Sequence, residues 1–366
     1  MNLKRALGTS VSLLAMFATA TSAFAQDLAA LEAAAKAEGQ LTTIALPHTW
    51  CGYGDVIAGF KAKYPEITIN ELNPDAGSAD ELEAIRANIG NTGPQAPDVI
   101  DVGLAFGPQA KGEGLIQPYK VSTWDTIPDS AKDAEGYWYG DYYGVMAFLV
   151  NTDIVSNPPK SIADLLNPEY ANSVALAGPP RTANQGIAGV FAAGLASNGG
   201  DVDNAAMAGL EFFKKLNDAG NFVPVTGNAA PLAQGTTPIV LAWDYNALAW
   251  KDGFAGNPAA EVIIPSDVTY GGVYVQAISA HAPHPNAAKL WMEYLYSDEG
   301  QIGWLKGYCH PIRFDDLMAR GVVPADVLAK LPEAGQATVF PTLAQVNAAR
   351  ETITGQWDTV VGANVE

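Results

Sequence analysis

Strand-like and helix-like segments alternate along most of the chain, and this alternation constrains the fold more than any other feature. Residues 41–46 form a short apolar run, and residues 67–72 alternate apolar with polar side chains. Between them, apolar residues over 56–64 recur at helical spacing, and the segment stops at Pro65. Strand, loop, helix and strand in this order are typical of a largely parallel, doubly wound sheet. The chain is therefore predicted to be an α/β protein.

The same order recurs further along the chain, and the units are joined by extended strands instead of a flexible linker. This predicts two lobes, each a mostly parallel sheet flanked by helices, joined by crossing hinge strands around a cleft. We assign residues 26–147 and 275–325 to the first lobe, and 148–274 and 326–366 to the second. Further strands are predicted at 98–102, 143–150, 174–176, 239–241, 262–264 and 274–278, and helices at 28–35, 79–88 and 285–296.

The first 25 residues have the three-part layout of a secretory signal peptide. Lys4 and Arg5 precede an apolar run over 11–18, and Ala23-Phe24-Ala25 is a small-x-small cleavage site. A short membrane anchor is the alternative, but the run is shorter than the roughly 20 residues that a spanning helix needs. We expect cleavage after Ala25, and export of the remaining chain to the periplasm.

The charge balance is strongly acidic, with 39 Asp and Glu against 20 Lys and Arg. Such a field repels phosphate backbones, so we expect no nucleic-acid partner. No motif for a nucleotide, a cofactor or a catalytic metal occurs; His281 and His284 are separated by a turn-forming proline. We expect no cofactor, no resident metal and a monomer.

Two cysteines, Cys51 and Cys309, are the only ones in the chain. In an oxidising compartment a pair of cysteines usually forms a disulfide, and we predict a bridge between them. Two buried free thiols are the alternative. A bridge would bring an early loop next to a segment near the end of the chain.

Several stretches resemble the extracellular solute-binding proteins of ABC importers, in the group that holds polyamine, ferric-ion, thiamine and phosphonate or sugar-phosphate binders. The most specific is the helix and turn over 283–301. Residues 35–42, 97–102 and 143–153 are similar to the first strand, the strand before a binding loop and the first crossing strand of that group. The resemblance covers nearly the whole exported chain. It implies the two-lobed type II periplasmic-binding-protein fold, and a binding protein that delivers a small solute to a permease in the inner membrane.

Loops that follow predicted strands supply the candidate ligand contacts, because ligands of open α/β sheets lie beyond the carboxyl ends of strands. The first loop offers aromatic faces that suit cations or apolar stems, and the next has small residues before a phenyl ring. A third segment, between a strand and a helix, offers a guanidinium and free helix N–H groups that suit an anion. The candidates in these loops are His48, Trp50, Tyr53, Phe106, Arg181, Thr182, Ala183 and Asn184.

The resemblance places further candidates on the second-lobe wall and on the second crossing strand: Trp243, Asp244, Tyr245, Tyr274 and Gln276. Asp244 could receive an amine. Ferric-ion relatives carry adjacent tyrosines where this chain has only Tyr245, and polyamine relatives carry an acid where it has Gln276. Ordinary core packing of these aromatic residues is the alternative throughout.

The best hypothesis from the sequence is therefore a solute-binding protein for a small zwitterion or a phosphate- or phosphonate-bearing molecule, held by Arg181, Thr182 and Asp244. Polyamine, ferric ion and thiamine remain alternative ligands. A binding module for a membrane sensor is a second class. A secreted hydrolase using His48 with Asp101 or Asp244 is a third, although no nucleophile or metal accompanies those residues.

Overall fold

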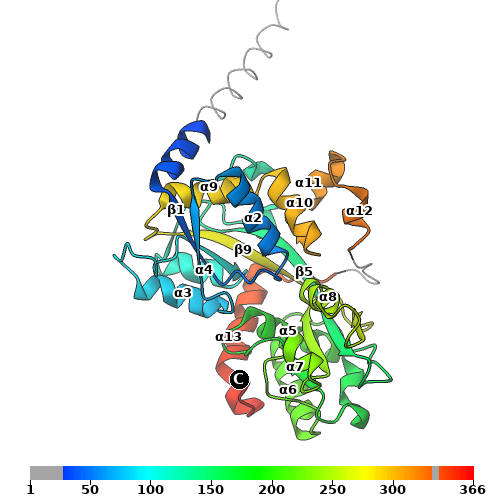
Figure 1. Ribbon diagram of the computed structural model, residues 1–366. Helices are drawn as coiled ribbons and strands as arrows, with labels where there is room; N and C mark the ends of the chain where they lie inside the picture. The colour runs from blue at the N-terminus through cyan, green and yellow to red at the C-terminus, as the bar shows by residue number, and fades with distance from the viewer. Residues whose placement is uncertain (1–27, 332–337) are drawn as a thin grey trace, which may run out of the picture.

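Two α/β halves, one above the other in Figure 1, make up the protein. The structure is a computed structural model that describes residues 28–331 and 338–366. The predicted signal peptide, residues 1–25, lies outside the described residues. No helix within the two described ranges is long and apolar enough to cross a membrane.

The upper half is built from the first part of the described chain and from a later segment that ends with α12, and its helices flank short strands. It begins with a helix over 28–38, as the apolar spacing predicts, and Gly39 ends that helix with a positive φ of 68°. Its elements up to the first crossing strand are β1 (Gln40–Ile44), α2 (Tyr53–Lys63), β2 (Thr68–Leu72), α3 (Ser78–Ala87), β3 (Val99–Gly103), α4 (Phe106–Gly112) and β4 (Ile116–Gln117). Its later elements are α9 (Pro285–Leu295), α10 (Asp298–Lys306), β10 (His310–Pro311), α11 (Phe314–Ala319) and α12 (Ala325–Leu328).

Two long strands, β5 (Tyr139–Asn151) and β9 (Gly271–Ser279), connect the halves. The first part of β5 pairs with β9, and its later part, from Met146, pairs with β7 in the lower half. β9 also pairs with β3 of the upper half. One sheet, in the order β3-β9-β5-β7-β6, therefore runs through the whole molecule, and the predicted crossing strand over 143–150 is confirmed.

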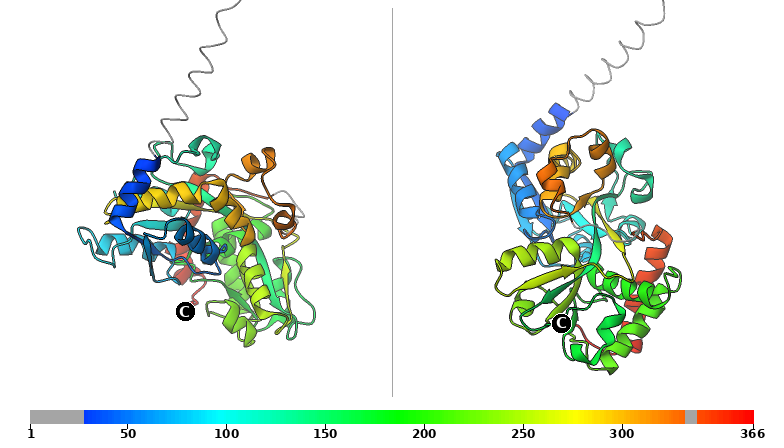
Figure 2. Two further views of the ribbon diagram at one scale, coloured as in Figure 1. Left: turned by 45° about the horizontal axis from the view of Figure 1, so that its top comes forward. Right: turned by 90° about the vertical axis from the view of Figure 1, so that its right-hand side faces the viewer.

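The lower half contains most of the middle of the chain. Its strands are β6 (Val174–Leu176), β7 (Ile239–Trp243) and β8 (Ala260–Ile263), and its helices are α5 (Asn184–Ser197), α6 (Ala205–Asp218), α7 (Ala229–Ala233), α8 (Asp244–Phe254) and α13 (Leu343–Val360). Figure 2 shows α13 packed along the lower half beside α5 and α6. Over both halves, the described residues also include four short 3-10 helices, at Trp124–Thr126, Asp129–Ala131, Ala163–Leu166 and Pro168–Tyr170.

The predicted two-lobed α/β class is confirmed, but the expected mostly parallel pairing within each lobe is wrong in detail. β1 pairs with β2, and β6 with β7, in parallel. The crossing strands β5 and β9 pair antiparallel with all of their neighbours, because each enters the sheet from the opposite half. Among the described strands, parallel pairing therefore occurs only where one or more helices connect the two neighbouring strands.

Large aromatic side chains fill the interior of both halves. Trp291 and Trp304 are fully buried in the upper half, and Trp243 and Trp357 in the lower half. The boundaries of the two lobes remain a prediction, but the crossing at β5 lies close to the predicted boundary at residue 147.

Candidate functional site

A cavity of about 710 Å³ lies between the two halves, at the end of β3 and beside β9. Volumes of this size are typical of sites for small organic ligands. Its upper wall comes from the loops after β1 and β2 and from the start of α3. Its lower wall comes from the segment before α5, the segment before α7, and α8. We call it the cleft cavity.

The upper wall carries four carboxylates. Asp75, in the loop after β2, and Asp80, in α3, are exposed. Glu81 and Asp101 are buried. Within the part of the chain that the structure describes, no Lys, Arg or His side chain lines this cavity. The upper wall is therefore an acidic surface without a neighbouring compensating cation.

Asp101 is the most constrained of these carboxylates. Its Oδ2 accepts hydrogen bonds from the hydroxyls of Tyr53 at 2.7 Å and Tyr142 at 2.6 Å. Its Oδ1 is buried and has no hydrogen-bond partner among the described residues. A buried carboxylate oxygen without a partner is costly, and a ligand donor would satisfy it.

Burial sets the protonation of this wall. Loss of water raises the pKa of Asp101, against the hydroxyls of Tyr53 and Tyr142, which lower it. Burial, followed by the charge of Asp101, also raises the pKa of Glu81, whose Oε2 accepts the backbone N–H of Asp101 at 2.9 Å. Burying these two carboxylate charges away from water costs free energy, and a cation bound between them offsets that cost.

An aromatic floor continues from the acidic wall to the crossing strands. Trp50 donates its indole N–H to the Tyr142 hydroxyl at 2.6 Å. Its ring meets the rings of Tyr245 and Tyr274 edge to face, with centroids 5.4 Å and 5.3 Å apart. Trp50 and Tyr274 line the cavity, and Tyr245 lies fully buried behind them. The floor offers ring surfaces that attract organic cations.

The lower wall is polar but uncharged. Thr182, Ala183 and Asn184 line it at the start of α5. Gln185 is held in place because its Oε1 accepts from the Asn246 amide at 2.9 Å and the Trp243 backbone N–H at 2.8 Å. The other lining residues with polar or aromatic side chains are Thr226, Asn228, Asn246 and Trp250. This wall can donate and accept hydrogen bonds without adding charge.

A disulfide fixes the loop that carries Trp50. Cys51 and Cys309 are bonded, with Cα atoms 5.4 Å apart, and both are fully buried. The loop and the turn before Cys309 touch so closely that a Cβ on Gly307 would lie 2.1 Å from the backbone carbon of Cys51. Because β10 follows Cys309 and pairs with β5, the bridge ties the Trp50 loop to a crossing strand. The predicted pairing of the two cysteines is present.

Five of the residues predicted from the sequence line the cleft cavity: Trp50, Thr182, Ala183, Asn184 and Tyr274. Four more lie directly behind the lining, namely Tyr53, Trp243, Tyr245 and Gln276. Gln276 donates to the Tyr53 hydroxyl at 2.7 Å, so it supports the carboxylate of Asp101 through that tyrosine. These supporting residues are buried and do not line the cavity.

The remaining four predicted residues are placed elsewhere. His48 is 64% exposed and pairs with Glu71. Phe106 is buried as the first residue of α4, and the Arg350 guanidinium lies 4.7 Å from its ring centroid.

Arg181 points away from the cavity, and Asp244 points into the protein. The guanidinium of Arg181 pairs with Asp358 at 3.2 Å and with Asn364, near the end of the chain. Asp244 is fully buried as the first residue of α8, where its Oδ1 accepts the backbone N–H of Val145 at 2.9 Å. Burial raises the pKa of Asp244 to about 7. The loop prediction for 243–246 missed that α8 starts at Asp244, immediately after β7 ends at Trp243.

Sequence reasoning did not select the carboxylates of the upper wall as ligand contacts; it named Asp101 only as an acid–base group of the hydrolase alternative. The segment Asp75 to Glu81 follows a predicted strand, as the chosen loops do, so the same rule would have selected it. Asp101 lies inside β3, and its polar side chain interrupts an apolar strand. That interruption is the sequence feature that indicates a functional role for Asp101.

Among the described residues, no group of three or more His, Cys, Asp or Glu side chains could hold a metal ion.

Comparisons with known structures identify proteins that share this fold. The periplasmic binding protein AfuA from Actinobacillus pleuropneumoniae, with fructose-6-phosphate bound, matches at 20% identity and a TM-score of 0.67, over 88% of this chain and 98% of that one. A periplasmic thiamin binding protein matches at 19% identity and a TM-score of 0.66, over 88% and 96%. Iron-bound HitA from Pseudomonas aeruginosa matches at 16% identity and 0.62, over 87% and 98%. At these identities the likeness establishes a shared two-lobed fold.

A sequence model of a family described as bacterial extracellular solute-binding protein matches residues 95–339. The match extends from the strand that carries Asp101 through the lower half and both crossing strands to the segment before α13. It covers more than half of the chain. This chain therefore belongs to the bacterial extracellular solute-binding protein family.

Proposed function

We propose that the protein captures a small organic cation in the cleft cavity and delivers it to an ABC permease. Family membership supports a small-molecule ligand, a periplasmic location and a permease partner. The observation that carries the ligand class is the upper wall, with four carboxylates and no basic side chain among the described lining residues. An ammonium group between Glu81 and Asp101 would satisfy the free Oδ1 of Asp101.

This proposal replaces the zwitterion or phosphonate that the sequence suggested. That hypothesis used Arg181 for the anion and Asp244 for the amine, and neither side chain lines the cavity. An anionic group would have only backbone N–H groups at the start of α5 and neutral side chains to meet it. Polyamines and thiamine, which are cations, remain in the proposed class, whereas ferric ion and phosphonates serve as contrasting ligands in the test.

Thermal unfolding across a solute panel tests the proposal. Putrescine, spermidine and thiamine are the cations; 2-aminoethylphosphonate, fructose-6-phosphate and ferric citrate are the contrasts. A solute at 100 times its Kd stabilises the folded state by about 2.7 kcal/mol, so a true ligand raises the Tm clearly. Solution scattering of the same samples should show a smaller radius of gyration when the halves close.

The outcomes separate the parts of the proposal. If only the phosphonate or the sugar phosphate raises the Tm, the cationic class is wrong while the binding role stands. If mass spectrometry finds the solute chemically altered after incubation, a secreted hydrolase replaces the binding protein. If no solute of either class binds and none compacts the protein, the cleft cavity is not the ligand site.

A further inference from the structure

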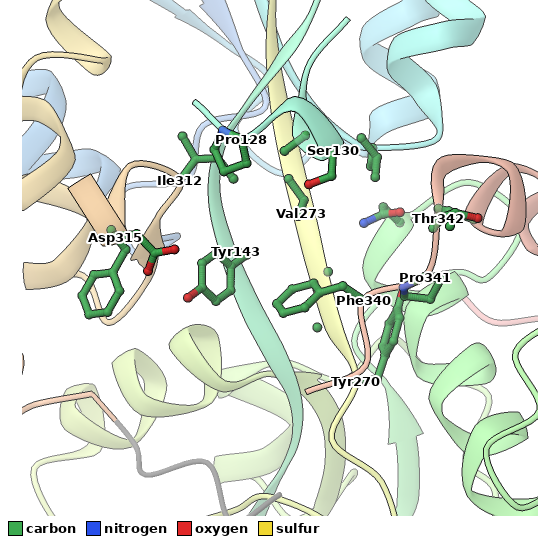
Figure 3. A pocket seen from close by; sticks show the side chains of 17 residues that line it. Pro128, Ser130, Tyr143, Tyr270, Val273, Ile312, Asp315, Phe340, Pro341 and Thr342 are labelled. Atoms are coloured by element: carbon green, nitrogen blue, oxygen red, sulfur yellow. The ribbon is translucent and has the colours of Figure 1, made fainter. Parts of the chain in front are cut away.

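A second cavity lies on the other face of the crossing strands. Its volume is about 390 Å³, and Figure 3 shows the side chains that line it. Side chains alternate along β9, so Tyr274 lines the cleft cavity whereas Val273 lines this one. Along β5, Tyr143 lines it, and its neighbour Tyr142 accepts from Trp50 on the cleft side. We call it the rear cavity.

The walls of the rear cavity are mainly apolar and come from three parts of the chain. Leu104 and Ile312 belong to the upper half, Val273 to the crossing strand, and Phe340 and Val346 to the C-terminal segment. The Phe340 ring stays 49% exposed although it meets the Tyr143 ring edge to face at 5.3 Å. An apolar ring left open to a hollow is a surface that a small ligand can cover.

Glycine at position 271 makes room for this wall. A Cβ there would lie 2.4 Å from Cε1 of Phe340, so any other residue would displace the ring. The position of Phe340 beside the cavity therefore depends on the sequence of β9.

One charge faces the rear cavity. Asp315, at the start of α11, lines it and is exposed, and within the described residues its carboxylate has no hydrogen bond or ion pair. Figure 3 places Asp315 and Tyr143 on one side of the cavity, and Pro341 and Thr342 on the other. Burial and then the charge of Asp315 raise the pKa of Tyr143 to about 12, so its hydroxyl keeps its proton near neutral pH. No basic side chain of the described residues lines the cavity.

We propose that the rear cavity is a second binding site, for a small amphiphilic amine with an apolar body and one ammonium group. The apolar body covers the rings of Phe340 and Tyr270 and the side chain of Val273. The ammonium meets the carboxylate of Asp315 and lies near the aromatic face of Tyr143. This site lies on the other face of the crossing strands from the cleft cavity, although Asn184 lines both. It differs from the cleft cavity in chemistry, because it has a single carboxylate and a largely apolar wall.

Calorimetric titration with 2-phenylethylamine tests the proposal on the exported chain. The wild-type protein should bind it, and 2-phenylethanol, which lacks the charge, should bind at least tenfold more weakly. Asp315→Asn should weaken amine binding about tenfold and leave alcohol binding unchanged. Val273→Phe fills the cavity and should abolish binding; Ser130→Trp, on the exposed rim, should do the same if Val273→Phe unfolds the protein.

A cleft variant separates this site from the proposed solute site. Glu81→Gln should weaken any binding of 2-phenylethylamine in the cleft cavity and leave its affinity for the rear cavity unchanged within twofold. If Glu81→Gln abolishes binding while Asp315→Asn does not, the amine occupies the cleft, and the rear site is refuted while the cleft proposal is strengthened. If the wild-type protein does not bind the amine, or if the alcohol binds as well as the amine, the proposed ligand class of the rear cavity is wrong.

Discussion

The two walls of the cleft cavity differ in charge although both are built from loops that follow strands. The upper wall has four carboxylates, two of them buried, and the lower wall has hydroxyls, amides and one indole. The upper wall can therefore contact a ligand through charge, and the lower wall through neutral hydrogen-bonding groups. We infer that the upper wall supplies most of the affinity for a cation, and that the lower wall orients the solute as the halves close.

Removing charge from the upper wall should have the largest effect on binding. Asp101→Asn or Glu81→Gln should weaken binding of a cationic solute about 100-fold, or roughly 2.7 kcal/mol, because one buried partner of the ammonium is lost. Isothermal titration against the best cation from the panel measures the change. Glu83→Gln is the matched control, since Glu83 lies on the same helix, is 68% exposed and pairs with Arg86. If Glu83→Gln weakens cation binding as much as the upper-wall variants do, the affinity does not come from the upper wall.

Lowering the pH should have the next largest effect. The pKa values of Glu81 and Asp101 are raised, so acid protonates them in the free protein and removes the charges that a cation needs. Affinity should fall about tenfold between pH 8 and pH 5.5, and cation binding near neutral pH should release protons. Titrations in buffers with different ionisation enthalpies detect that release.

The same pKa shifts predict the opposite pH dependence for the stability of the free protein. A carboxyl whose pKa is raised in the folded state stabilises that state below the pKa of the unfolded chain, and the contribution is lost as the pH rises through the folded value. Asp244, with a pKa of about 7, adds to this trend. The free protein should therefore melt at a higher temperature at pH 5.5 than at pH 8. A flat or reversed trend would mean that these acids are ionised and paired in the free protein.

The lower wall should give smaller losses. Trp250→Ala removes the indole that lines the lower wall and should weaken cation binding about threefold to fivefold, as expected for one cation–π contact. Phe254→Ala, on the same helix but outside the cavity lining, is the control and should change affinity by less than twofold. A loss as large as that of Asp101→Asn would make the two walls equivalent.

Arg181→Ala should have the smallest effect. The guanidinium is occupied by Asp358 and Asn364 and does not line the cavity, so affinity for cationic and anionic solutes alike should change by less than twofold. The same titrations measure it. A selective loss of anionic ligands would restore the original role of Arg181 in the sequence hypothesis.

The elements of the fold were predictable because their periodicity is local. Strands at 41–46, 98–102 and 239–241, and the helix that starts at Pro285, appear within a few residues of the expected bounds. Strand pairing was less predictable, because the antiparallel ladders of β5 join residues about a hundred positions apart.

The site was predictable only in part, because a loop position does not reveal the direction of a side chain. Thr182 and Arg181 are adjacent, yet one lines the cavity and the other reaches the C-terminal segment. Asp244 looked available after its strand, but α8 begins there and turns its carboxylate inward to Val145. The positions of Glu81 and Asp101 beside the cavity depend on how α3 packs against β3, and no local sequence pattern predicts that packing.

The bridge between Cys51 and Cys309 has a consequence for how an exported chain acquires its shape. Together with β9 and α9, it makes the upper half depend on residues that leave the membrane late if translocation runs from the N-terminus. The loop that carries Trp50 must then wait, with its cysteine unpaired, while about 258 further residues emerge. Since Cys309 is the only other cysteine of the chain, oxidation of Cys51 before Cys309 has emerged could join it only to a thiol of another molecule.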